Sequence, residues 1–477
     1  MDISIAPSNP TALQLAQRID AAGRLHVDLR AVFALALPLV ANSAVQTLLN
    51  LTDLWFIGHI STRAVAAVGA VNWLVIVVVM VLSGVNMAVQ TIVAQAYGGG
   101  RYVRASQAVW STLWGTLCVA PLYYAAGAAG HRMLEPFGLA SDVTTLASQF
   151  WFPRVGGAPF GAAVWGVLGF FNGIGRPRIT FAVTAAIAVA NALLNELFVV
   201  KLGWGVSGSA WASSTAQAIG LAIALIVFLQ PGFRALYKSH LTYRPRPRAM
   251  WEQLRLGTPM GLTYASDLLA MSLFLLMQVR LSEVDGAASQ IVAVVTALAY
   301  MPGIGIALAG TTLVGQSIGA SQRDWAMRVG SSVIGITATT MGGIGILVAA
   351  LGPWILPLLV SAADPQAPAV MARAAQILWL AAAYQFFDGL NVGSGLCLRG
   401  AGDAAVPALL VLVLAALVFV PVAHMLTFAP GQGWFDLLPQ FGWGSLGGWV
   451  AVIIYVLLLG STLFVRWRLG AWQRIHL

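Results

Sequence analysis

The stretch Thr91-Ile92-Val93-Ala94-Gln95 recurs 221 residues later as Thr312-Leu313-Val314-Gly315-Gln316, and both copies lie inside long apolar segments. Further matches follow along the chain, with an offset that grows from 221 to 227 and 239: Pro38 with Pro259, Gly98 with Gly319, Gly173 with Gly400, Gly175 with Gly402, and Gly203-Trp204-Gly205 with Gly442-Trp443-Gly444. A growing offset places insertions in loops. We therefore expect two structurally equivalent halves in tandem, related by a pseudo-two-fold axis along the membrane normal, with the substrate path between them.

The composition indicates a membrane protein, because 59% of the 477 residues are apolar and only 9% are charged. A soluble domain carries about 25% charged residues. Twelve apolar runs each reach the roughly 20 residues that a helix needs to cross a bilayer: 31–58, 64–96, 106–130, 142–172, 179–200, 206–230, 251–281, 286–317, 327–359, 367–398, 404–428 and 444–465. The sequence predicts an all-α membrane protein with twelve transmembrane helices in two pseudo-symmetric six-helix bundles.

The basic residues predict the orientation of the chain. With both termini cytoplasmic, 19 of the 25 Lys and Arg fall in cytoplasmic segments and six outside, as the positive-inside rule requires. This placement in short loops also argues against nucleic-acid binding, despite the net charge of +9. The expected organisation is a cytoplasmic segment at 1–30 without a cleavable signal peptide, a six-helix lobe at 31–230, a basic cytoplasmic linker at 231–250, a second lobe at 251–465 and a cytoplasmic tail at 466–477.

Motifs for enzymatic chemistry are missing from the sequence. No nucleophile elbow, phosphate-binding P-loop or metal-binding cluster of His and Cys occurs. The two cysteines, Cys118 and Cys397, lie in apolar runs and are interpreted as buried packing residues. We expect a transporter that is neither an enzyme nor an ATP-hydrolysing pump.

Carboxylates inside apolar runs mark the candidate sites, because burying one in the bilayer costs about 2.5–3.5 kcal/mol. In the first half, Asp53 continues a polar stripe of Asn42, Gln46 and Asn50 at helical spacing. Asn191 and Asn195 share a face four residues apart, and Glu196 follows them. Interhelical hydrogen bonding alone explains about half of such amides, whereas a carboxylate indicates function.

In the second half, two acids also lie well inside apolar runs. Asp267 lies one turn from Thr263 and Tyr264, and Gln278 continues its face. Asp388 forms a stripe with Tyr384, Asn391 and Gly395, and Gln385 lies alongside. These acids should face a cavity or a partner.

The chain resembles the multidrug and toxic compound extrusion (MATE) transporters, NorM-type branch, over nearly its full length. The motifs that carry the resemblance are Pro38 to Asp53 followed by Phe56-Ile57-Gly58, Val93-Ala94-Gln95-Ala96-Tyr97-Gly98, Asn172-Gly173-Ile174-Gly175-Arg176-Pro177, Asn191 to Asn195, Gly205 to Ala210, Gly257-Thr258-Pro259, Val314-Gly315-Gln316, Tyr384 to Asp388, and Leu398-Arg399-Gly400.

The resemblance implies a secondary antiporter that exports amphipathic organic cations in exchange for protons or sodium ions. It needs no cofactor beyond such an ion, sits in the cell membrane (the inner membrane of a bacterium) and is expected to be a monomer. In the first lobe, it implies a cation or proton site of Asp53, Asn191, Asn195 and Ser213, to which we add Gln46 and Asn50. In the second lobe, it implies a cation or substrate site at Asp267 and Asp388, with Gln385, Tyr384 and Gln316; Glu196, Asn391 and Gln278 are further candidates.

Two points depart from the family pattern or leave it open. The seventh-helix acid is often Glu, and Asp267 is one methylene shorter. Glu196 has no place in the pattern and is interpreted either as a proton site or as a helix-interface carboxylate.

Three other classes of protein fit the sequence less well. A lipid-linked precursor flippase of the same superfamily usually has extra helices and a basic cavity, whereas the charges here are acidic. A transporter of the major facilitator type would need inter-helix signatures that are missing. A receptor or assembly subunit is disfavoured by buried acids in both halves. Substrate, coupling ion and stoichiometry are not fixed by the sequence.

Overall fold

The computed structural model describes residues 16–21, 23–135, 141–360, 365–435 and 437–475, so the first 15 residues of the expected N-terminal segment lie outside it. Nearly all of the rest is helical. In chain order the helices are α1 (Leu29–Gly58), α2 (Thr62–Met87), α3 (Val89–Gly98), α4 (Tyr102–Ala128), α5 (Gly130–Leu134), α6 (Ser141–Gly156), α7 (Ala158–Gly173), α8 (Pro177–Asn195), α9 (Gly205–Phe228), α10 (Pro231–Tyr237), α11 (Pro247–Leu281), α12 (Glu283–Gly319), α13 (Arg323–Ala350), α14 (Gly352–Leu359), α15 (Ala367–Gly400), α16 (Ala405–Leu414), α17 (Val420–Thr427) and α18 (Gly444–Leu469).

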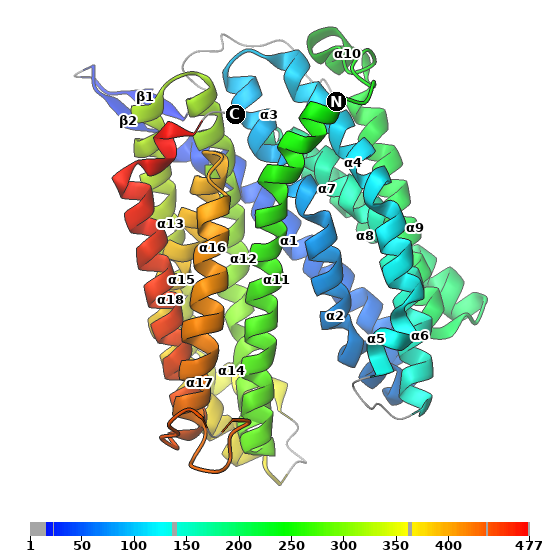
Figure 1. Ribbon diagram of the computed structural model, residues 1–477, viewed down its shortest axis with the longest axis vertical. Coiled ribbons are helices and arrows are strands. Elements are labelled where there is room, and N and C mark those ends of the chain that lie inside the picture. The colour runs from blue at the N-terminus through cyan, green and yellow to red at the C-terminus, as the bar shows by residue number, and fades with distance from the viewer. Residues whose placement is uncertain (1–15, 22, 136–140, 361–364, 436, 476–477) are drawn as a thin grey trace.

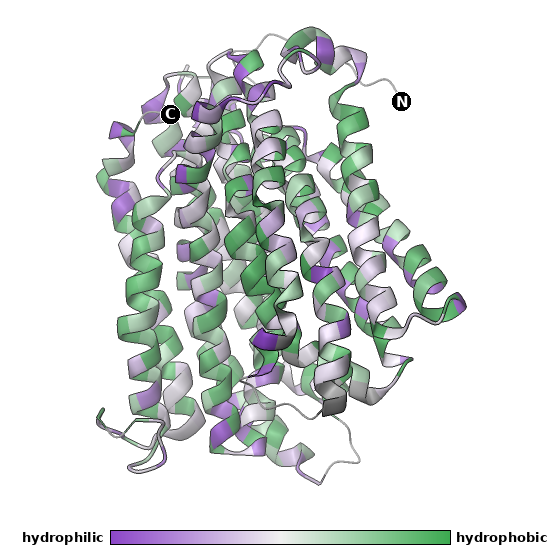
Figure 2. Cartoon of the chain, turned by 45° about the vertical axis from the view of Figure 1, so that its right-hand side comes forward, coloured by the Kyte–Doolittle hydropathy of each residue, from purple (hydrophilic) through white to green (hydrophobic). Residues whose placement is uncertain are grey.

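Most of these helices form long rods that run side by side (Figure 1). Among the described residues, ten helical segments are long and apolar enough to cross a membrane. Two further rods, α4 and α15, have 27 and 34 residues and are also long enough. They are less apolar because they turn polar side chains into the bundle, as α15 does with Tyr384 and Gln385. Together these rods form the predicted all-α bundle of twelve helices, and Figure 2 shows its apolar flanks.

Several rods are interrupted where the sequence predicted one continuous helix. The second span breaks at Ala88 between α2 and α3, and the fourth breaks at Gly157 between α6 and α7. Two spans contain a wider π-helical turn, η2 (Glu196–Lys201) and η3 (Ala415–Phe419). Such breaks are tolerated in membrane helices where neighbouring groups satisfy the freed backbone atoms.

Three small elements were not predicted. A hairpin of β1 (Gln17–Ile19) and β2 (Leu25–Val27) precedes α1. The short helix α10 begins the segment that was predicted as a linker, and α11 already starts at Pro247. A 3₁₀ turn, η4 (Ala471–Arg474), follows α18.

The first helix of each half packs against the opposite half. Val32, Ala36 and Leu39 of α1 belong to a hydrophobic cluster formed mostly by α12, α13, α15 and α18. Leu256 and Met260 of α11 belong instead to a cluster of the first half. This reciprocal packing buries apolar surface between the halves and holds them together.

The hydrogen bonds between the two halves come in pairs, and the two members of a pair join residues that correspond in the sequence repeat. The hydroxyl of Thr91 donates to the carbonyl of Arg399 at 3.0 Å, and its repeat partner Thr312 donates to the carbonyl of Asn172 at 3.0 Å. The same pairing holds one turn later. The amide of Gln95 donates to the carbonyl of Gly400 at 3.1 Å, and Gln316 donates to the carbonyl of Gly173 at 2.8 Å. We call these four side chains, Thr91, Gln95, Thr312 and Gln316, the interlobe latch.

Glycines let the backbones meet at the latch. A Cβ on Gly98 would overlap the backbone of Gln316, and a Cβ on Gly319 would overlap the backbone of Gln95. Both glycines end their helices, α3 and α12, at the end of the molecule where the β1–β2 hairpin lies (Figure 1). The two halves are therefore closed against each other at this end.

We expect Gly98→Ala to weaken the latch, because the added methyl group meets backbone atoms that cannot turn aside. Overpacking of this kind costs about 1–3 kcal/mol. The melting temperature of the purified protein should fall by several degrees. The matched control is Gly335→Ala, also in a helix but with nothing within 4 Å of the added Cβ; it should melt at or above the wild-type temperature. Equal melting temperatures for both variants would contradict the latch.

Candidate functional site

Asp53 lies at the centre of a hydrogen-bonded cluster in the first half. Its Oδ1 accepts hydrogen bonds from the side-chain amides of Asn191 at 3.0 Å and Asn195 at 2.8 Å. Its Oδ2 accepts from the hydroxyl of Ser213 at 2.6 Å. Asn191 also donates to the Ser213 oxygen at 3.1 Å. The structure thus brings together the four residues at which the resemblance placed a cation or proton site.

Three helices supply this cluster: α1 carries Asp53, α8 carries both asparagines and α9 carries Ser213. The four-residue spacing of the asparagines puts their amides on one face of α8, one turn apart. Both are fully buried, and the Oδ1 atom of each lacks a hydrogen-bond partner among the described residues. The carboxylate therefore meets only neutral donors, and two amide oxygens next to it are free to take a further ligand.

Other members of the predicted first-half site lie apart from this cluster. Gln46 and Asn50 are exposed on α1 and are not among the described residues that donate hydrogen bonds to the carboxylate of Asp53. Glu196 is exposed at the start of the π-helical turn η2. It points away from Asn195 because successive helix residues are turned by about 100°.

The two acids of the second half line a separate polar region. The hydroxyl of Tyr455 on α18 donates to Asp267 Oδ1 at 2.8 Å, and Asn391 donates to Asp388 Oδ1 at 3.3 Å. A cavity of about 90 Å³ is lined by Asp267 and Asn391, among other residues.

Several residues around this cavity were not predicted from the sequence. Tyr455 lies in an apolar run with no polar stripe, and Tyr300 lines the cavity from α12. The guanidinium of Arg399 lies 5.9 Å from the ring centre of Tyr264. The carboxylate of Asp403, which also lines the cavity, is paired with Arg466 at 2.7 Å. Only Arg399 carried a signal, as part of the Leu398-Arg399-Gly400 motif.

Comparison with known proteins settles the family. The family model described as MatE matches residues 38–197 and 259–425, one stretch in each half. The chain belongs to the MatE family. This assignment makes it a membrane transporter and not an enzyme.

Relatives within the MatE family span nearly the whole chain. It is 31% identical over 457 residues to the "Probable multidrug resistance protein NorM" of Pseudomonas aeruginosa, with 93% of this chain and 90% of that protein covered. The protein of the same name from Agrobacterium fabrum is 26% identical, with 92% and 93% covered.

Solved structures share the MATE fold. A crystal structure of MATE in complex with MaL6 superimposes with a TM-score of 0.83 at 18% identity and covers 98% of this chain and all of that one. An outward-facing conformation of a multidrug resistance MATE family transporter gives a TM-score of 0.79 at 17% identity, with 93% and 96% covered.

The remaining predicted residues of this MATE chain are dispersed. Gln385 is buried and donates to the carbonyl of Thr296 at 3.3 Å, and Tyr384 stacks on Trp449 with ring centres 6.3 Å apart. Gln316 does not join the acids of the second half, because its amide is held in the latch. Gln278 is fully buried, and neither of its side-chain polar atoms has a hydrogen-bond partner among the described residues.

One cysteine interpretation is wrong. Cys397 is buried as predicted, but Cys118 is exposed on α4. An apolar run in a membrane helix has a lipid-facing side as well as a packed side, so the sequence alone does not separate the two.

Proposed function

We propose that the chain is a multidrug efflux antiporter that exports amphipathic organic cations in exchange for protons or sodium ions. The names of the NorM relatives support multidrug export. The hydrogen-bonded carboxylate of Asp53 carries the proposed ion coupling. It is the one formal charge in a cluster of neutral partners.

A proton or a sodium ion can each neutralise this carboxylate. Three hydrogen bonds to Asp53 stabilise its charged form. A proton on Oδ2 would require only that the hydroxyl of Ser213 turn from donor to acceptor. A sodium ion prefers oxygen ligands, and a half-turn of the Asn191 or Asn195 amide would direct an unpaired Oδ1 atom toward it.

The acids of the second half are proposed to attract the organic cation. Asp267 and Asp388 supply the negative charge, and Tyr264 and Tyr300 supply aromatic faces that favour cations. The cavity of about 90 Å³ is far smaller than the roughly 300–1,000 Å³ of a drug-sized site. Substrate binding at these acids therefore requires the cavity to widen beyond the arrangement seen here.

Antiport follows from competition for these buried negative charges. Expelling a monovalent cation against an inside-negative potential costs about 2.3 kcal/mol per 100 mV. Entry of one proton or sodium ion returns that amount and adds the free energy of its own gradient. If ion and substrate each weaken the binding of the other, exchange is obligatory and reciprocal.

The interlobe latch supplies the gate in this proposal. The halves are held together at the end where α3 and α12 finish, and the distribution of Lys and Arg assigns this end to the cytoplasm. The structure then corresponds to a state closed to the cytoplasm. Breaking the latch would open the substrate path from that side.

The proposed function is tested by flux in proteoliposomes with an organic cation such as ethidium. We expect export when either a proton or a sodium gradient of the correct sign is imposed alone, and only background leakage without a gradient. Ethidium flux that equals protein-free liposomes under both gradients would contradict the proposal.

A further inference from the structure

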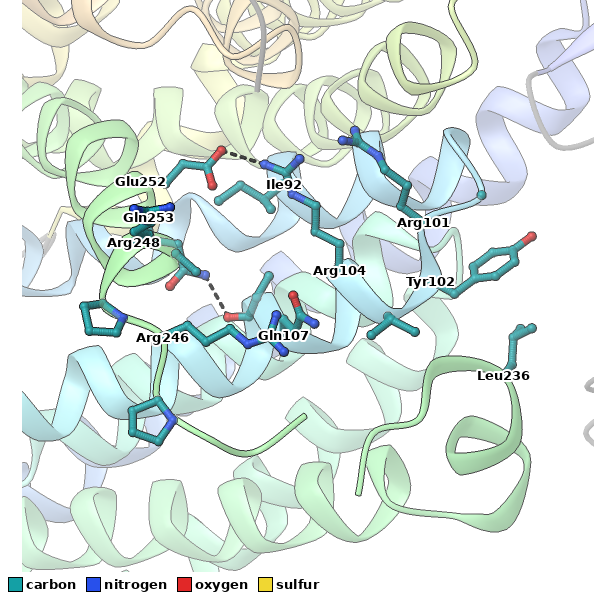
Figure 3. Close-up of a pocket in the computed structure, with 16 residues that line it drawn as sticks. Ile92, Arg101, Tyr102, Arg104, Gln107, Leu236, Arg246, Arg248, Glu252 and Gln253 are labelled. Atoms are coloured by element: carbon teal, nitrogen blue, oxygen red, sulfur yellow. Dashed lines mark hydrogen bonds and ion pairs between the residues drawn. The ribbon is translucent and has the colours of Figure 1, made fainter. Parts of the chain in front are cut away.

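A large basic pocket lies at the same end of the molecule, between the two halves (Figure 3). Its volume is about 1000 Å³. One wall is the start of α4, and the other is the start of α11 with the segment before it. The described lining residues include four arginines, Arg101, Arg104, Arg246 and Arg248, and one acid, Glu252, which gives a net charge of 4 − 1 = +3.

Only part of this positive charge is compensated. Arg104 pairs with Glu252 at 2.7 Å, across the boundary between the halves (Figure 3). Burial and then the neighbouring charge of Arg104 lower the pKa of Arg101, against the opposing effect of Glu252. The guanidinium of Arg101 remains charged at neutral pH, so the pocket holds an excess of positive charge.

The backbone around the pocket also favours an anion. Helices α4 and α11 both begin there, and neither N-terminus has a side-chain cap. The dipoles of the two helices therefore add positive potential at the pocket. The side chain of Gln253 is almost fully buried against the pocket, and its Oε1 atom lacks a partner among the described residues. That oxygen could accept from an O–H or N–H group of a bound ligand.

The four arginines of the pocket are not repeated in the other half of the sequence. At the offset of 221, Arg101 corresponds to Gln322 and Arg104 to Trp325. Arg246 and Arg248 correspond to Leu25 and Val27, in the β-hairpin region. The basic pocket therefore has no counterpart at the symmetry-related position of the repeat.

The tryptophans near the pocket indicate its level relative to the membrane surface. Trp110 and Trp114 of α4 donate their indole N–H groups to the carbonyls of Ser239 and Tyr243 in the linker. Trp251, in the first turns of α11, is 66% exposed. Tryptophans of membrane proteins gather at the level of the lipid headgroups, which places the arginines at phosphate depth.

We propose that this pocket binds a phosphate group, and its depth favours the headgroup of an anionic phospholipid as the source. Arginine is suited to this ligand because its guanidinium donates two parallel hydrogen bonds to phosphate oxygens. Since both halves contribute to the pocket, the bound phosphate would tie them together in the state closed at this end.

The test uses the purified full-length protein and its melting temperature in the presence of dioctanoyl phosphatidylglycerol or inorganic phosphate. The variant combines Arg101→Gln, Arg246→Gln and Arg248→Gln, and leaves the Arg104–Glu252 pair intact. The matched control combines Arg178→Gln, Arg234→Gln and Arg468→Gln, three exposed arginines that do not line the pocket.

We expect the lipid to stabilise the wild type and the control, with a half-saturating concentration about tenfold or more higher in the pocket variant. Glu252→Gln should lower the half-saturating lipid concentration, because it removes the acid among the described residues that line the pocket. Stabilisation by inorganic phosphate alone, equally dependent on the arginines, would identify a soluble phosphate as the source. Equal responses of the pocket variant and the control to both probes would overturn the proposal.

Discussion

Asp53→Asn should abolish ion-coupled export while leaving the protein folded. The substitution is nearly isosteric, and it removes the one charge for which proton and sodium ion would compete. The donors around it can be satisfied again: the remaining oxygen can accept from the amides of Asn191 and Asn195, and the hydroxyl of Ser213 can turn to accept from the new amide. We expect gradient-driven ethidium flux in proteoliposomes to fall at least about tenfold, and the free energy of unfolding to change by no more than about 1 kcal/mol.

The matched control for this experiment is Glu196→Gln. Glu196 neighbours Asn195 in sequence but is exposed outside the cluster, so its neutralisation should leave coupled flux close to wild type. Normal coupling in the Asp53 variant, or loss of coupling only in the Glu196 variant, would show that the coupling site has been assigned to the wrong carboxylate.

Asp388→Asn and Asp267→Asn should each reduce export of organic cations strongly, by about tenfold or more. Both acids lie within the second bundle, where a charge without a counter-ion is costly to maintain. Asn391 and Tyr455 hold them by hydrogen bonds, which an asparagine can still accept through its oxygen. Efflux of ethidium from intact cells, compared at equal protein levels in the membrane, measures the effect.

Asp324→Asn is the control for the second-half acids. It removes a carboxylate from the same half, but from the exposed first turn of α13. Efflux should be unchanged. Wild-type efflux by both variants of the buried acids would exclude them from the transport path.

The fold was largely predictable because bilayer burial requires long apolar runs, and these are visible in the sequence. The repeat was equally visible, and the latch contacts obey its offsets: Thr91 and Thr312 differ by 221, and their acceptors Asn172 and Arg399 by 227. The breaks at Ala88 and Gly157 were missed, since an apolar run looks the same whether or not its helix is continuous.

The sites were predictable to a smaller extent. Helical spacing indicated that Asp53 faces a polar environment, but only the resemblance connected it with Ser213 on another helix. Tyr455, the partner of Asp267, had no signal, because one tyrosine in an apolar run is compatible with any orientation. Gln316 was grouped with the second-half acids through its Val314-Gly315-Gln316 motif, and a motif does not tell whether a side chain faces a cavity or the opposite half.

The most direct test of the account is whether ion and substrate compete for the protein. The binding of tetraphenylphosphonium to the purified protein can be measured over a series of pH values and sodium concentrations, with potassium replacing sodium to keep the ionic strength constant. The account predicts that the dissociation constant rises with the concentration of the coupling ion, proton or sodium, and that Asp53→Asn weakens this dependence. A wild-type dissociation constant that stays the same across both series would contradict competition as the basis of transport.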